Sequence, residues 1–374
     1  MSDGTRDLLF QLIRFSLWGE KIPMTGMGHK EYGALMETAS RQTVEGLVAN
    51  ALIENGVRLE KYDAINTYSL LGTLRQQNDF MNKELAGLCQ LMRENKIKFV
   101  VMKGQTVAAR YPQPRDRVIG DIDFYCPPSD FQKACEVIQN QWHAEIEENE
   151  VGKHVAFLHN DVDYELHSFL NDFSSKSSQQ YFDELVERSV EDWNGNPSVV
   201  TVADEDVPVL TPALDIAFSF VHLYMHLQEL GVGLRQFCDL AMLCHDAFGS
   251  GRGEATRKEL KQILTTLGYV RAFRAVGAVL VDCLGLSPEE FPFAIENKDR
   301  RYKEYILDIV FKRGNFGKYG RKNMVGSGIG YLIEATWVKV SHYLRLFPLS
   351  PKENSAMLFN KLPLRIKNTI THQG

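Results

Sequence analysis

Apolar side chains recur at helical spacing through the first quarter of the chain. The runs 8–15 and 70–91 place large apolar residues three or four positions apart. A period of about 3.6 residues puts such side chains on one face of a helix. Glycine and asparagine between the runs mark helix ends. We therefore predict an all-helical region over residues 1–95.

The period changes to that of β-strands after residue 96. The apolar stretch IKFVVMKG (97–104) is followed by a short amphipathic segment and then by the strand-like run VIGDIDFYC (118–126). This order is typical of a β-α-β unit. A helix is expected next over 129–140, with Ser129 as its N-cap.

Two more strands are expected in HVAFLH (154–159) and VDYELHSF (162–169), and the turn residues between them predict a hairpin. The helical period returns from about residue 178 and holds almost to the end. Its clearest helix spans 211–230, where a threonine N-cap precedes a proline at the first helical position.

This order of elements places the fold in the α+β class. A helical region over 1–95 precedes a small mixed β-sheet unit over 96–175, and a helical domain follows over 176–374. With 374 residues, 44% of them hydrophobic, the chain is long enough for several packed units.

Composition and charge exclude some functions. The formal net charge of −6 argues against non-specific binding of nucleic acid, because such binding needs a basic face. The six cysteines form no CxxC pair, so reduced thiols are expected rather than zinc sites or disulfides. The N-terminal stretch reads as neither a secretory signal nor a membrane span. We therefore expect a cytoplasmic protein with no membrane partner.

Two acids stand one residue apart in the strand predicted over 118–126. Alternate residues of a strand share a face, so Asp121 and Asp123 project together while Ile122 and Phe124 face the core. Like charges this close repel unless a cation lies between them, and two carboxylates with open coordination suit Mg²⁺ serving a phosphate substrate. The alternative is an edge strand whose solvent face simply reads Asp-x-Asp.

The neighbours of this acid pair favour a phosphate site. Lys103 and Gly104 end one strand and open a helix, and a glycine turn of this kind lets backbone N–H groups approach a phosphate. In DYELH (163–167), charged and apolar residues alternate, so Glu165 offers a third acid from a separate strand, as a two-ion site needs. Lys103 and Arg117 are candidate phosphate partners, although either can be a solvated surface cation.

These motifs together resemble a known family. KGQTVAARYPQPRDRVIGDIDFY, followed by VDYELHSFL, is similar to the bacterial uncharacterised nucleotidyltransferases, which have the nucleotidyltransferase fold of the DNA polymerase β superfamily. The motifs cover about residues 97–170, with a looser likeness in HLYMH and GLRQFCDLAML further on. The resemblance implies a nucleotidyltransferase-type mixed sheet with helical flanks.

The resemblance also implies roles for individual residues. Asp121, Asp123 and Glu165 match the acids that bind the catalytic metals, Mg²⁺ or Mn²⁺, and Glu165 also helps to activate the attacking hydroxyl. Gly104 and Gln105 match the position whose backbone cradles the NTP. Gln105 replaces the usual serine there, and its amide can act as a donor in place of the hydroxyl.

The implied reaction transfers a nucleoside monophosphate from an NTP to a hydroxyl of an unidentified acceptor, a small molecule or protein rather than nucleic acid. The alternative is a catalytically inactive relative that acts as a nucleotide-binding or protein-interaction module, which the replacement at Gln105 motivates. A third reading, a nucleic-acid-modifying enzyme, depends on the glycine-rich, basic segment 313–330, which otherwise reads as a mobile surface loop.

Four histidines are candidate substrate contacts. His222 and His226 lie four apart and share a helix face, a spacing that zinc helices use. No glutamate follows His222, so a metalloprotease site lacks its base. His154 and His167 lie on the predicted hairpin, from which they can reach the acids.

One arginine and one aspartate complete the candidate set. Arg235 and Asp239 are four apart in GLRQFCDLAML. They either form an ordinary ion pair along one helix or face the cleft as substrate contacts.

Overall fold

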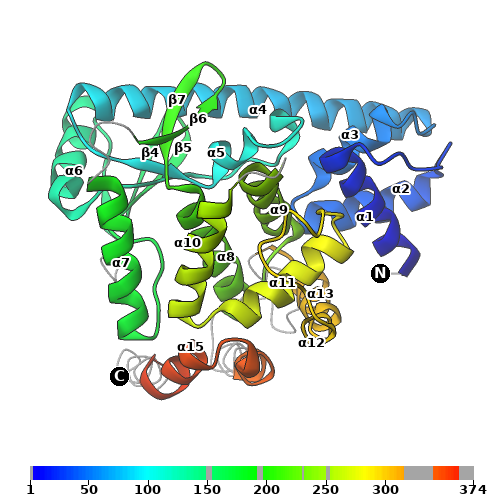
Figure 1. Ribbon diagram of the computed structural model, residues 1–374. Helices are drawn as coiled ribbons and strands as arrows, with labels where there is room; N and C mark the ends of the chain where they lie inside the picture. Colours follow the sequence, from blue (N-terminus) through cyan, green and yellow to red (C-terminus); the bar gives the residue numbers. More distant parts are fainter. Residues whose placement is uncertain are drawn as a thin grey trace, which may run out of the picture.

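The computed structural model describes residues 3–148, 154–191, 197–229, 231–249, 253–315 and 340–361. Helices fill the part before the first strand, as the apolar spacing predicts. They are α1 (Asp3–Trp18), α2 (His29–Arg41), α3 (Glu45–Glu54) and α4 (Lys61–Glu94). The longest of them, α4, runs across one side of the molecule (Figure 1).

Five strands form one mixed sheet in the order β1-β2-β5-β4-β3. They are β1 (Val100–Met102), β2 (Ile122–Tyr125), β3 (Glu147–Glu148), β4 (His154–His159) and β5 (Val162–His167). β2 and β5 are parallel, and the other neighbours are antiparallel. The four predicted strands are confirmed, and only β3 was not expected. Asn160 and Asp161 make the predicted hairpin turn, with φ of 50° and 60°.

Two helices connect the strands. After β1 comes the short α5 (Gly104–Ala108), and after β2 comes α6 (Pro128–Trp142). The prediction of Ser129 as the N-cap of α6 is wrong. Pro127 is the N-cap, Pro128 opens the helix, and the Ser129 hydroxyl donates a hydrogen bond to Glu191 instead.

The C-terminal part is mostly helical, but not throughout. The prediction of an unbroken helical period from residue 178 is wrong at β6 (Ser198–Val202) and β7 (Glu205–Val209), which pair as a separate hairpin. The β-branched residues of SVVTV alternate between exposed and less exposed positions, which suits a strand. The helices here are α7 (Lys176–Glu191), α8 (Pro212–Glu229), α9 (Leu234–Phe248), α10 (Glu254–Leu267), α11 (Val270–Asp282), α12 (Asn297–Arg300), α13 (Lys303–Arg313) and α15 (Pro351–Ala356).

Further sequence interpretations concern a helix, a basic segment, the cysteines and membrane spans. The helix predicted over 211–230 is α8, and Pro212 is its first residue. Of the basic segment 313–330, residues 316–330 lie outside the described residues. Every described cysteine is a free thiol, as expected. No described helix is both long enough and apolar enough to cross a membrane.

Two apolar cores lie on opposite faces of the sheet. Ile122 and Phe124 pack with α4 and α6 on one face, as predicted for the alternate residues of that strand. Val100, Met102 and Tyr125 point to the other face and join a larger core with α7, α8 and the N-terminal helices. Figure 1 shows α4 on one side of the strands and α7 to α10 on the other. The polar residues of β2, β5 and β4 thus face the C-terminal helices.

Candidate metal and nucleotide site

The register of the strands places the candidate residues side by side. Asp123 of β2 lies opposite Glu165 of β5 in the parallel pair. Across the antiparallel pair, His154 of β4 lies opposite His167. Asp121 lies directly before β2. Because side chains alternate along a strand, these residues share the sheet face that does not carry Ile122 and Phe124.

The structure brings the three acids together. Ligand oxygens of Asp121, Asp123 and Glu165 lie within 4.8 Å of one another. Asp123 is buried, Glu165 is partly buried and Asp121 is exposed. This donor set fits a hard divalent ion, which takes oxygen ligands and leaves positions open for a substrate.

Asp123 is surrounded by positive charge from the chain itself. Lys103 Nζ lies 3.2 Å from Asp123 Oδ1, and His167 Nε2 lies 2.9 Å from the same oxygen. Burial alone would raise the pKa of Asp123, but Lys103 and His167 lower it below its ordinary value. For Asp121, the surrounding protein atoms partly desolvate the carboxylate although the residue as a whole is exposed, and this and the charge of Asp123 together raise the pKa. The hydrogen bond from His167 lowers the pKa of Glu165.

A strained turn sets the position of Lys103. Its φ of 55° and ψ of −148° are unusual for a residue with a side chain, and Gly104 follows with φ of 45°. A Cβ on Gly104 would lie 3.3 Å from the carbonyl oxygen of Asp121, so the turn packs closely against that acid. The Lys103 ammonium also lies 5.4 Å from the ring centroid of Phe218 on α8. The turn and α8 together hold this cation beside Asp123.

The Gln105 side chain points away from the acids. It is 5% exposed, and its Nε2 donates hydrogen bonds to Asn78 Oδ1 at 3.2 Å and Asn82 Oδ1 at 2.6 Å, both on α4. The expectation that this amide replaces a phosphate-binding hydroxyl is therefore wrong, because two α4 asparagines already bind it. The backbone of Gly104 and Gln105 remains beside the site.

Arg117 is also held elsewhere. It is 4% exposed, and its guanidinium donates to both carboxylate oxygens of Asp239 at 2.7 and 2.8 Å. Tyr111 OH donates to Asp239 at 2.7 Å. The interpretations of Arg117 as a phosphate partner and as a surface cation are therefore both wrong, because Asp239 neutralises its charge inside the protein. Tyr111 was missed, since no sequence period connects it with α9.

Arg235 does not pair with Asp239. Its Nη1 donates to the carbonyl oxygens of Val118 and Ile119 at 3.2 and 2.9 Å, the residues that lead into β2. Asp239 is taken by Arg117, so the intrahelical ion pair is absent from this part of α9. Arg235 instead faces a cavity of about 890 Å³ beside Asp121.

The charged residues that line the cavity beside the acids are mostly carboxylates. Its charged lining residues are Asp121, Glu145, Glu147, Asp163, Glu165 and Arg235. The sequence offered no signal for the two glutamates near β3, because that strand was not predicted.

The α8 histidines lie near the acids without joining them. Their rings meet edge to face, with centroids 4.4 Å apart. Burial and the ammonium of Lys103 hold the pKa of His222 well below its ordinary value and lower that of His226 to about 4. Among described residues, the groups spaced to hold an ion contain neither of them.

The chain is similar to a known protein family and, more weakly, to a solved structure. A family described as "uncharacterised nucleotidyltransferase" matches residues 29–285, a range that contains every candidate residue above. The crystal structure of an antigenic nucleotidyltransferase-like protein from Paracoccidioides brasiliensis is similar over 56% of this chain and 94% of its own, with a TM-score of 0.35 and 12% identity. No curated protein matches the chain.

Proposed function

The chain belongs to the family of uncharacterised nucleotidyltransferases, and on that premise we propose that it transfers a nucleoside monophosphate from an NTP to an acceptor hydroxyl, with release of pyrophosphate. The observation that carries this proposal is the convergence of three acids beside a lysine and a glycine turn. Asp121, Asp123 and Glu165 would hold Mg²⁺ or Mn²⁺. Bound there, such an ion offsets the charge of the triphosphate and lowers the pKa of the acceptor hydroxyl.

The chain's own residues supply binding and proton transfer. The Lys103 ammonium group lies beside the acids and can rotate toward a bound phosphate. The turn at Gly104 has no side chain to keep a phosphate from the backbone. Glu165, whose pKa is lowered by the hydrogen bond from His167, is ionised at neutral pH and can accept the hydroxyl proton.

The charge of the cavity bears on the acceptor. Glu145, Glu147 and Asp163 line it in addition to the two site acids. Carboxylates repel the phosphates of a nucleic acid, so the acceptor we propose is a neutral or cationic small molecule or a protein. His154, His167, His222 and His226 are within the same region and remain candidate contacts, as does Arg235.

One observation favours the alternative of an inactive relative that binds nucleotide or a protein partner. Gln105 stands where the resemblance expects a serine, and its side chain is bound to α4. Phosphate binding then depends on the backbone and Lys103 alone, which lowers the expected affinity for an NTP.

Calorimetry of each NTP with Mg²⁺ or Mn²⁺ tests the proposal. We expect metal-dependent NTP binding by the native chain. In Asp121→Asn and Asp123→Asn the NTP affinity should fall at least about 100-fold, because each substitution removes a metal ligand. Asp79→Asn, which changes an exposed acid on α4, is the matched control and should bind as the native chain does. No binding by the native chain, or equal binding by all variants, would contradict the proposal.

A further inference from the structure

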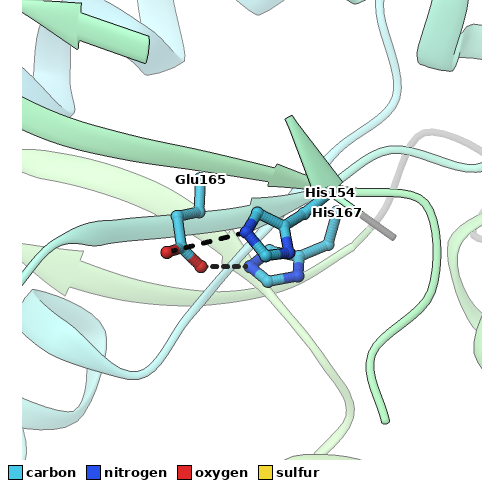
Figure 2. Close-up of side chains that lie close together, drawn as sticks. All are labelled: His154, Glu165 and His167. Carbon is cyan, nitrogen blue, oxygen red and sulfur yellow. Dashed lines mark ion pairs between the residues drawn. The ribbon is translucent and has the colours of Figure 1, made fainter. Parts of the chain in front are cut away.

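Two histidines lie beside Glu165, one of the three acids. The rings of His154 and His167 both turn toward the Glu165 carboxylate (Figure 2). His167 Nε2 lies 3.4 Å from Glu165 Oε2, and His154 Nε2 lies 3.9 Å from Glu165 Oε1. All three side chains are partly exposed, so an ion can reach them from solvent.

Strand pairing holds this group rigidly. His154 and His167 are cross-strand partners on β4 and β5, and Glu165 is two residues before His167 on the same face. Directly opposed side chains on neighbouring strands are close enough to bind one ion, and the ladder fixes their spacing. The ligand atoms of all three lie within 4.8 Å of one another.

The spacing and the atom types suit a transition metal. Bonds of about 2.0–2.1 Å from a tetrahedral ion to nitrogen or oxygen put neighbouring ligand atoms roughly 3.3 Å apart. The distance from His167 to Glu165 is already close to this value, and that from His154 needs only a small movement. Imidazole nitrogen favours zinc-type ions, whereas an all-carboxylate set favours Mg²⁺ or Mn²⁺.

We propose that His154, Glu165 and His167 bind a transition metal ion of the zinc type, next to the three-acid site and sharing Glu165 with it. Asp123 Oδ1, 2.9 Å from His167 Nε2, is placed to be a fourth ligand, in which case Asp123 as well as Glu165 would be shared between the two positions. This inference deepens the proposed function, on which it rests for the role of the shared acid. The site then has two metal positions: a hard position at Asp121, which suits Mg²⁺ or Mn²⁺, and a softer position at the histidines, which suits a zinc-type ion.

Cobalt(II), whose visible absorption reports nitrogen and oxygen coordination, is the probe. The full-length chain is stripped with chelator and titrated with Co²⁺ in excess Mg²⁺, which occupies the hard position. We expect saturable binding of a single equivalent, displaced by Zn²⁺, and a loss of affinity of at least about 100-fold in His154→Gln and His167→Gln. His159→Gln is the control, since His159 lies on the same strand but stacks on Trp142 on the opposite face.

A further variant separates this inference from the proposed function. Asp121→Asn should lose metal-dependent NTP binding but keep the Co²⁺ spectrum, because Asp121 is not one of the softer ligands. Thermal unfolding shows whether each variant is folded. If His167→Gln does not fold, the Co²⁺ affinity of His154→Gln alone tests the inference. Unchanged Co²⁺ affinity in His154→Gln, or equal loss in Asp121→Asn, would overturn the inference.

Discussion

The two buried carboxylates near the site, Asp123 and Asp239, each have an opposite charge within hydrogen-bond distance, and this determines which residues remain for a ligand. Arg117 and Asp239 satisfy each other, with Tyr111 as a third member. Asp123 has Lys103 and His167. Burying a charge without a partner is costly, so the pairing is set by packing rather than by position in the sequence.

Removing the charge of Asp239 should therefore destabilise the fold strongly. Asp239→Asn leaves the Arg117 guanidinium buried without its counter-charge, and we expect a loss of about 3–5 kcal/mol in the free energy of unfolding. Urea denaturation measures it. Asp246→Asn removes an exposed partner of Arg110 and should cost less than about 1 kcal/mol. Equal small losses in the two variants would show that the buried pair does not stabilise the fold.

At the scale of elements, α3 packs closely against its neighbours at Gly46. A Cβ there would lie 2.1 Å from the carbonyl oxygen of Asp116 and 2.4 Å from Leu74 on α4. Backbone cannot move aside as a flexible side chain can. The contact therefore fixes α3 against the turn that precedes β2, and with it the end of the strand that carries the acids.

Gly46→Ala tests this contact. The added methyl has no space, so we expect a loss of about 2 kcal/mol or more in the free energy of unfolding. Gly33→Ala is the matched control, because Gly33 lies in α2 with nothing within 4 Å of its added Cβ. It should gain roughly 0.5–1 kcal/mol from helix propensity. Thermal unfolding separates the two, and a Gly46→Ala chain as stable as the native one would contradict the model of close contact.

Periodicity predicted elements well where local pattern decides them. β4 and β5, their hairpin turn and the shared face of Glu165 and His167 all follow from strict alternation. The orientations of the Gln105 and Arg117 side chains could not be predicted, because their hydrogen-bond partners lie on α4 and α9, which are distant in the sequence. The β6–β7 hairpin was missed for a similar reason, since a short valine-rich run reads equally as strand or buried helix.

At the scale of the whole molecule, the site lies where the sheet meets the C-terminal helices. α8 contributes Phe218 beside Lys103, and it carries His222 and His226 toward the same region. Both histidines stay neutral in the folded protein because burial and the lysine oppose their protonation. Folding of this interface is thereby linked to pH.

Acid should weaken the fold through these histidines. Burial and the Lys103 ammonium lower the pKa of His226 from its ordinary value of 6.5 to about 4 in the folded protein, so the unfolded chain binds more protons between these values. The free energy of unfolding therefore falls as pH drops from 6.5 towards 4. His226→Gln should reduce that fall by about 1–2 kcal/mol in urea titrations across this range. The exposed His143→Asn is the control, and an unchanged pH dependence in His226→Gln would contradict the linkage.

The pairing of Asp123 with Glu165 has a consequence for how the chain tolerates insertions and deletions. A residue inserted within β2 or β5 changes odd positions to even ones, so the acids would turn into the apolar core and Phe124 or Leu166 would turn toward the site. A residue inserted in a connecting loop leaves that parity intact. Relatives of this chain can thus vary in loop length around the sheet and keep the same chemistry, whereas the two short strands must keep their length and phase.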